Sequence, residues 1–379
     1  MKKTLHEHFD PENGEKRILA LDGGGIRGAL TLGFLEEIEE ILRNKYKDQD
    51  LRLCDYFDLI GGTSTGAIIA AALALGYDVK TIKEKYFELG NVIFKNKWWK
   101  IWTFPRKILK FKYPEKKFES ILNDFFGDKT LSSNEIKTGL CIITKRIDSG
   151  SVWPIINHPE GKFYTENCNY LVKDLIRAST AAPSYFQPKR LKIIDQESKK
   201  EFDGTFVDGG VSTDLNPSLK LFLIATLEGF PFHWSCGEDK LMIVSLGTGS
   251  HYFNFDKSRF HRKTNLFWGI NLPDFYMDDI SWHNQTLMQY FSNSVTNYNI
   301  DSEIGNLEND LICETPLFKY LRYNVMLEPD ELRKIGLDNY IEKPGLKSLR
   351  KMDKGKNATA LYTIGKNAAK QIVTRDHFD

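Results

Sequence analysis

The chain has 379 residues, of which 41% are hydrophobic and 27% are charged, a composition typical of a folded globular protein. Its formal net charge of +1 gives no broad positive field, so we expect no nucleic-acid partner. The five cysteines are scattered without a C-x-x-C pair, which argues against a zinc ribbon or a disulfide framework and favours a reducing, cytoplasmic location.

No apolar stretch is long enough to cross a bilayer. The longest apolar run, residues 67–75, falls far short of the ~20 residues that a spanning helix needs. The N-terminus has two lysines but lacks the apolar segment of a secretory signal. We therefore expect neither a secreted precursor nor an integral membrane protein.

The first predicted strand, residues 17–21, runs into the glycine-rich loop Asp-Gly-Gly-Gly-Ile-Arg-Gly at 22–28. A helix is expected from Ala29, because apolar residues then recur close to helical spacing. A glycine loop at a helix N-terminus offers several backbone N–H groups that can stabilise the oxyanion formed when an ester is attacked. Arg27 adds a positive charge beside the loop.

The same loop fits a second kind of site. Gly23, Gly25 and Gly28 satisfy the G-x-G-x-x-G pattern of dinucleotide-binding folds. That pattern expects an acidic residue about 20 positions further on, at the end of the next strand. Asp48 and Asp50 lie near this spacing but within a polar run, and the next strand ends in a serine turn instead. We therefore favour the oxyanion interpretation and expect no cofactor and no bound metal.

The serine turn follows the second predicted strand, residues 56–60. It reads Gly62-Thr-Ser64-Thr-Gly66, and the helix-forming run 67–75 follows it. A nucleophilic serine needs a sharp turn between strand and helix, and small residues such as Gly62 and Gly66 let the backbone turn and the substrate approach. The alternative is an ordinary strand-to-helix turn.

Residues 94–118 hold nine lysines and arginines against one acid, interleaved with aromatic residues that include Trp98, Trp99 and Trp102. Tryptophan favours membrane interfaces and clustered lysines favour anionic headgroups, so the segment is a candidate for docking on an anionic membrane surface. The alternative is a cap whose tryptophans pack on the core while its lysines face water. A nucleic-acid patch fits poorly beside an ester-hydrolysis site.

The rest of the chain alternates between strands and helices as far as residue 249, which predicts a largely parallel sheet with helices on both faces. Further strands are predicted at 139–147, 152–156, 191–194, 202–207 and 241–246. Further helices are predicted at 79–89, 116–126, 170–179, 218–227, 282–297 and 358–374. Residues 343–356 are basic and contain glycine, and we expect an exposed connection there.

The strand at 202–207 leads into Asp208-Gly209-Gly210, where glycines allow close approach to a carboxylate at a strand end. Taken alone, Asp-Gly most often marks a plain turn. The glycine loop and the serine turn reverse that preference and make Asp208 a candidate partner for Ser64.

Five blocks of the sequence resemble motifs of the patatin-like phospholipases, in the order of that family. They are Asp-Gly-Gly-Gly-Ile-Arg-Gly at 22–28, Gly-Thr-Ser-Thr-Gly at 62–66, Ala-Ser-Thr-Ala-Ala-Pro-Ser-Tyr-Phe-Gln-Pro at 178–188, Asp-Gly-Gly at 208–210 and Ser-Leu-Gly-Thr-Gly at 245–249. The resemblance covers about residues 16–250 and does not extend to the last third of the chain.

The resemblance implies a three-layer α/β/α fold with a mostly parallel central sheet, and hydrolysis of acyl esters on lipids by a Ser–Asp dyad. By its motifs, Ser64 would be the nucleophile and Asp208 its partner. The oxyanion hole would be built from the loop residues Gly23, Gly24, Gly25, Arg27 and Gly28. Residues 16–250 would form the catalytic domain, with residues 251–379 as a C-terminal extension packed on it.

A dyad requires Asp208 within hydrogen-bond reach of Ser64, with burial tuning the pKa of the carboxylate, because a free carboxylate is a weak base toward a serine hydroxyl. A triad would need a histidine. The candidates by number are His158, His233, His251, His261 and His283. None lies in a turn motif that marks it as catalytic.

The function that we expect is a phospholipase A or lysophospholipase-like hydrolase acting on phospholipids or related glycerolipids. An acyltransferase with the same serine is one alternative, and a gated lipase effector of a bacterial defence system is another. Expected partners are the lipid substrate and a transient anionic membrane surface, while homo-oligomerisation is left open.

Overall fold

The computed structural model describes residues 2–94, 115–194, 200–252 and 265–379, the last range without 301, 302, 304 and 309. The basic-aromatic segment predicted at 94–118 thus lies outside the described residues except at its two ends, and so does His261.

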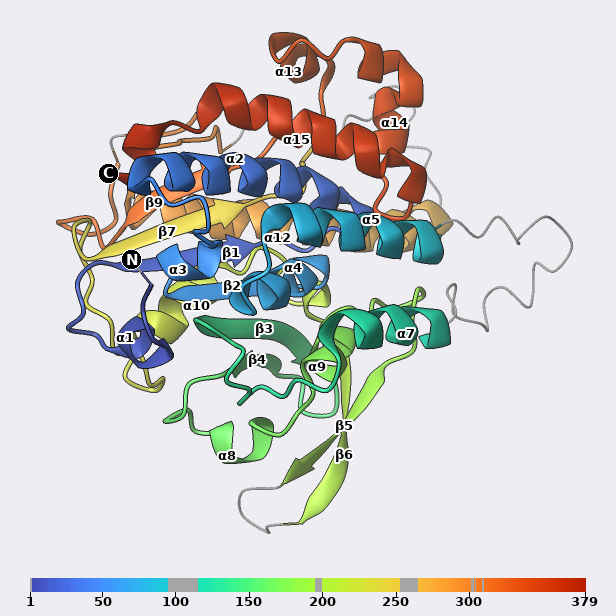
Figure 1. The fold of residues 1–379 in the computed structure, drawn as a ribbon. Coiled ribbons are helices and arrows are strands. Elements are labelled where there is room, and N and C mark those ends of the chain that lie inside the picture. Colours follow the sequence, from blue (N-terminus) through green and yellow to red (C-terminus); the bar gives the residue numbers. More distant parts are fainter. Residues whose placement is uncertain are drawn as a thin grey trace, which may run out of the picture.

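A nine-stranded sheet forms the centre of the described part of the chain, in the order β5-β6-β3-β2-β1-β7-β9-β8 with β4 paired to β3. The parallel strands are β1 (Lys16–Leu21), β2 (Leu59–Thr63), β3 (Gly139–Arg146), β7 (Leu241–Leu246), β8 (Asn293–Ser294) and β9 (Lys319–Tyr323). The antiparallel strands are β4 (Val152–Ile156), β5 (Lys189–Ile194) and β6 (Glu201–Asp208). Figure 1 shows β5 and β6 projecting from one edge of the sheet.

Helices cover both faces of the sheet, which gives three layers (Figure 1). One face carries α2 (Gly28–Tyr46), α3 (Leu53–Tyr56), α4 (Thr65–Ala74), α5 (Val79–Phe94), α7 (Glu115–Phe126), α9 (Val172–Ser179) and α15 (Ala358–Ile372). The other carries α1 (Leu5–Phe9), α10 (Ser218–Thr226) and α12 (Asn265–Tyr290). Short helical segments complete the fold: α8 (Tyr164–Asn167), α13 (Pro329–Lys334), α14 (Leu346–Leu349), and the turns η1 (Gly25–Arg27), η2 (Gly209–Val211), η3 (Ile341–Gly345), η4 (Gly355–Asn357) and η5 (Arg375–Phe378).

The two cores follow from the alternation of side chains along the central strands. In β1, Leu19 and Leu21 pack with the helices of one face, whereas Ile18 and Ala20 pack with those of the other. Parallel strands that are buried on both faces have apolar residues at nearly every position, as β7 does and as β1 does from Ile18 to Leu21. This pattern made the central strands predictable, and the α/β fold with a mostly parallel sheet is confirmed.

The region after residue 250 adds to the same sheet. Strand β9 pairs in parallel with β7, and α15 lies side by side with α2 on one face (Figure 1). The boundary that we proposed at residue 250 therefore divides a continuous sheet. Among the described residues, no helix combines the length and the apolar character that crossing a bilayer requires.

Two expectations in this region were wrong. The helix predicted at 282–297 is the end of the longer α12, which stops at Tyr290 because the chain then turns to pair β8 with β9. Residues 343–356 are not simply an exposed connection. Leu349 in α14 is fully buried, and the carbonyl of Met352 accepts a hydrogen bond of 2.8 Å from the amide of Ile26 in the glycine loop.

Candidate active site

The order of the strands brings the three predicted loops to one end of the sheet. The glycine loop follows β1 and the serine turn follows β2, its parallel neighbour. Asp208 is the last residue of β6. Strand β3 lies between β6 and β2 and pairs with both. The register sets Thr63 beside Ile143, and Thr144 beside Asp208. Ser64 and Asp208, which are 144 positions apart in the sequence, thus lie on either side of the same short stretch of β3.

Ser64 occupies a strained turn at the start of α4. Its backbone has φ 56° and ψ −121°, a conformation that costs a non-glycine residue about 1–3 kcal/mol. A Cβ on Gly62 would lie 2.3 Å from the carbonyl of Gly66, and one on Gly66 would lie 2.3 Å from the carbonyl oxygen of Leu21. Both flanking positions therefore require glycine, as expected for a nucleophile elbow.

The side chain and the backbone amide of Ser64 have different hydrogen-bond partners. Its Oγ donates a hydrogen bond of 2.6 Å to Oδ2 of Asp208. Its backbone N–H donates to Oγ of Ser179 at 2.8 Å, and that hydroxyl in turn donates to the carbonyl of Ile143. Ser179 lies in one of the blocks that carried the family resemblance, but the sequence assigned it no role. Its contacts make it a support of the elbow backbone.

Asp208 is buried, with 5% of its surface exposed, and both carboxylate oxygens are engaged. Oδ2 accepts the hydroxyl of Ser64, and Oδ1 accepts the amide of Gly210 at 2.7 Å. Burial raises the pKa of Asp208 to about 6, although both hydrogen bonds act in the opposite direction. A carboxylate with this pKa is a stronger base than an exposed one and is still ionised at neutral pH.

None of the described histidines forms a hydrogen bond to Ser64 or Asp208. His158 packs between the rings of Phe9 and Phe232, on the face of the sheet opposite to the one that α4 covers. The pKa of His251 is lowered to about 4 by burial and by the positive charges of Arg27 and Arg350.

The glycine loop contains two amides that are not engaged in hydrogen bonds with the described residues. Three of the five candidate amides donate within the protein: Gly23 to Leu215 O at 2.9 Å, Arg27 to Gly24 O at 3.2 Å, and Gly28 to Gly25 O and Ile26 O. The amides of Gly24 and Gly25 have no such acceptor among the described residues. Of the five loop residues that the family motif suggests for an oxyanion hole, only Gly24 and Gly25 therefore have a backbone N–H that is not already donated to a described residue.

Close packing on several sides fixes the conformation of this loop. A Cβ on Gly24 would lie 2.2 Å from Oγ1 of Thr248, whose hydroxyl donates to the carbonyl of Gly23 at 3.1 Å. Gly25 has φ +58°, and its Cβ would lie 2.4 Å from the carbonyl oxygen of Met352. Thr248 belongs to the Gly-Thr-Gly block at 247–249, whereas no sequence signal pointed to Met352.

Arg27 is buried at 3% exposure, so its charge lies inside the protein rather than at the rim of the site. Within the described ranges, no group of three or more His, Cys, Asp and Glu side chains is arranged to hold a metal ion. At this end of the sheet the structure brings together a serine hydroxyl, a buried carboxylate and backbone amides.

Comparisons with known proteins identify the family of this chain. The family model for patatin-like phospholipase matches residues 19–218. A cGAMP-activated phospholipase of Escherichia coli (strain TW11681) is 27% identical over 248 residues, which cover 65% of this chain and 66% of the relative. Patatin-17 of Solanum cardiophyllum is 31% identical over 264 residues, which cover 64% of this chain and 62% of the relative. The chain thus spans less than two thirds of the length of these two relatives.

Among solved structures, VipD from Legionella pneumophila aligns with a TM-score of 0.37 at 13% identity, over 92% of this chain and 67% of that one. A likeness at this level supports no inference about function. The family model is more informative, because it matches more than half of the chain and spans both Ser64 and Asp208. On this evidence, the chain belongs to the patatin-like phospholipase family.

Proposed function

We propose that this protein is a lipid acyl hydrolase that cleaves the acyl esters of phospholipids or related glycerolipids through a Ser64–Asp208 dyad. The observation that carries the proposal is the hydrogen bond of 2.6 Å from Ser64 Oγ to Asp208 Oδ2, formed at a strained elbow between strand and helix. Family membership supports lipid ester hydrolysis, and the hydrogen bond supplies a nucleophile with an adjacent base.

The proposed reaction has two halves. Ser64 Oγ attacks the ester carbonyl as its proton passes to Asp208, and the oxyanion accepts hydrogen bonds from the amides of Gly24 and Gly25. When the tetrahedral intermediate collapses, the C–O bond of the ester breaks and the leaving alcohol takes the proton from Asp208. Water then attacks the acyl-enzyme with Asp208 again as base, which releases the fatty acid and restores Ser64.

Gly24→Ala is expected to lower kcat by about 100-fold or more, with little change in KM, because the loop donors act only once the oxyanion forms. The added Cβ would meet Thr248 Oγ1 at 2.2 Å and so displace the backbone that carries the amide. The measurement is steady-state kinetics on a small soluble ester.

Gly229→Ala is the matched control, since nothing lies within 4 Å of a Cβ there. It should retain the kinetics of the parent protein. A folded Gly24→Ala variant with parental kcat would remove the glycine loop from the mechanism.

The direct test of the proposed function is product analysis on vesicles of defined composition. Phosphatidylcholine and phosphatidylglycerol vesicles, each with a labelled acyl chain at one glycerol position, should yield free fatty acid and lysophospholipid in equal amounts. Absence of both products from every lipid would contradict the proposal. Repeating the assay at high salt tests docking on an anionic surface, because screening weakens the attraction between surface lysines and headgroups.

Two variations of the same assay test the alternatives. Adding an alcohol or a lysolipid as acceptor distinguishes a transferase, which would form a new ester instead of free fatty acid. The name of the E. coli relative gives a specific reason to test gating. Hydrolysis that rises well above its basal rate when cGAMP is added would identify a nucleotide-gated effector.

A further inference from the structure

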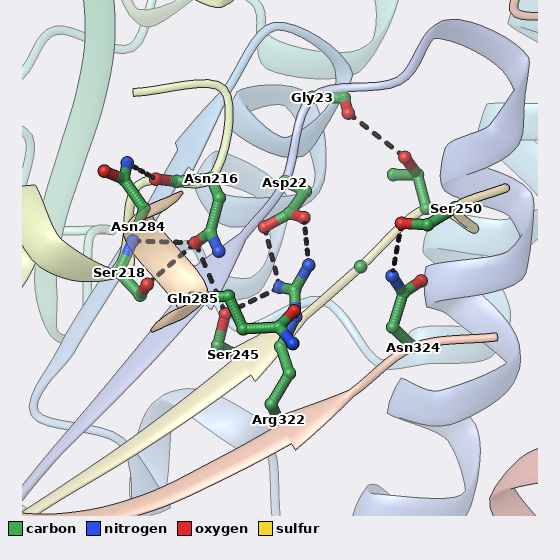
Figure 2. Close-up of polar contacts among 12 residues, drawn as sticks. Asp22, Gly23, Asn216, Ser218, Ser245, Ser250, Asn284, Gln285, Arg322 and Asn324 are labelled. Atoms are coloured by element: carbon green, nitrogen blue, oxygen red, sulfur yellow. Dashed lines mark hydrogen bonds and ion pairs between the residues drawn. The ribbon is translucent and has the colours of Figure 1, made fainter. Parts of the chain in front are cut away.

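A buried ion pair anchors the start of the glycine loop to a strand that is 300 positions later in the chain. Arg322 of β9 donates from Nη1 to Asp22 Oδ1 at 3.0 Å and from Nη2 to Asp22 Oδ2 at 2.6 Å (Figure 2). The two side chains are only 1% and 6% exposed. Two parallel bonds between a guanidinium and a carboxylate fix the orientation as well as the distance.

The rest of the guanidinium is also engaged. Nη1 donates to Oγ of Ser245 in β7 at 2.7 Å, and Nε donates to Oε1 of Gln285 in α12 at 3.1 Å. Figure 2 shows Arg322 between these partners, with its guanidinium facing Asp22. One side chain thus ties the glycine loop to two neighbouring strands and to the helix that covers them.

The same network reaches the loop that follows Asp208. Ser245 Oγ donates a long hydrogen bond of 3.5 Å to Oδ1 of Asn216, which lies in that loop (Figure 2). The backbone adds a second connection, because the amide of Gly23 donates to the carbonyl of Leu215 at 2.9 Å. The loop with the oxyanion donors and the loop with the base are therefore joined through one buried polar cluster.

The glycine loop needs such an anchor. Three consecutive glycines have more conformational freedom than any other tripeptide, so the positions of the Gly24 and Gly25 amides depend on what holds the loop from outside. A buried ion pair is often not required for stability, since apolar side chains of similar volume can replace it without loss. What such a pair can add instead is a fixed register between distant parts of the chain.

We propose, on the basis of the function proposed above, that Arg322 is a positioning residue for the reaction: through Asp22 and Ser245 it sets the Gly24 and Gly25 amides relative to Ser64 and Asp208. Strand β9, which lies outside the residues matched by the family model, then completes the catalytic unit. An enzyme truncated after residue 250 would lack this part of its active site.

The test is a variant that removes both charges together, Asp22→Asn with Arg322→Met. Removing one partner would leave the other buried and uncompensated, whereas the double change leaves no unpaired charge. We expect a melting temperature near that of the parent. On a small soluble ester, kcat should fall about 10- to 100-fold with KM within about threefold, because small displacements of catalytic groups lower the rate steeply. The acid limb of the pH profile, which belongs to Asp208, should not move.

Asp58→Asn is the matched control for loss of a buried carboxylate. Asp58 pairs with Lys3 and His8 at the opposite end of β2 from Ser64, at 2.7 and 2.8 Å. It should lower stability but keep the parental kcat at a temperature where the protein is folded. Arg322→Lys keeps the charge without the two-bond geometry, and its kcat should lie between those of the double variant and the parent.

Ser64→Ala, measured in the same assay, separates the two proposals. If it retains parental activity, the proposed function is wrong. If it is inactive while the folded double variant has the parental kcat, only the positioning role of Arg322 is overturned. Should the double variant fail to fold, Arg322→Lys and Ser245→Ala decide the question: lowered kcat in the folded variants supports the role, and parental kcat in both overturns it.

Discussion

Ser64→Ala is expected to abolish ester hydrolysis, with a loss of turnover on the order of 10⁴- to 10⁶-fold, the range seen when serine hydrolases lose their nucleophile or its base. Ser64 is the one residue of the elbow whose hydroxyl contacts a carboxylate, at 2.6 Å from Asp208 Oδ2. A fluorophosphonate probe followed by peptide mass spectrometry should label Ser64 in the parent protein and nothing in the variant. Labelling that persists in Ser64→Ala would assign the nucleophile elsewhere.

Three other serines in the recognised blocks serve as internal controls: Ser179, Ser184 and Ser245. The probe should not label them, because the hydroxyls of Ser179 and Ser245 are used in buried hydrogen bonds. Ser184 is exposed and, among the described residues, has no carboxylate partner like the one that Asp208 provides for Ser64. The backbone at Ser64 adds a second readout. Because its φ is 56°, Ser64→Gly should be as inactive as Ser64→Ala but more stable by about 1 kcal/mol, measured by denaturant unfolding.

Asp208→Asn is expected to lower turnover by about 10⁴-fold, by analogy with the loss of other catalytic bases, and at the same time to stabilise the protein at neutral pH. Asparagine keeps the shape of the side chain and can still accept the amide of Gly210 and contact Ser64. What it removes is a buried negative charge; loss of hydration on burial disfavours this charge and raises the pKa of Asp208 from 3.8 to about 6.

The sign of the stability effect follows from that shift. A carboxyl whose pKa is higher in the folded protein favours folding while it is protonated, and this contribution is lost as the pH rises from about 4 through about 6. Each pH unit corresponds to about 1.4 kcal/mol, so the ionised group costs on the order of 3 kcal/mol at pH 8. Asp208→Asn should therefore be more stable than the parent at pH 8 and show no gain at pH 4, measured by urea unfolding at both values.

The pH profile of the parent protein provides the matching kinetic measurement. If the carboxylate form of Asp208 is the base, kcat/KM should rise about tenfold per pH unit up to about pH 6 and then level off. His158→Gln and His251→Gln should leave this profile unchanged. A profile that loses its acid limb in either histidine variant would replace the dyad with a triad.

Much of the candidate site was predictable because its parts are local. The elbow depends on residues 62–66, whose two glycines and serine lie within five consecutive positions, and the backbone at Ser64 has the strain that such a turn requires. The apolar runs of β1 and β7 likewise indicate strands buried on both faces. The pattern of neighbouring residues was therefore enough to predict which segments are strands or helices and which loops carry the candidate site residues.

The tertiary structure alone decided how these loops combine. Ser64 meets Asp208 because β3 lies between β2 and β6, and no local pattern specifies that order of strands. Met352 and Arg322 reach the glycine loop from the last part of the chain, where the motifs ended and the sequence indicated only an extension. The physical reason is that propensity and periodicity act over one or two turns, whereas strand order and buried polar contacts depend on the packing of the whole sheet.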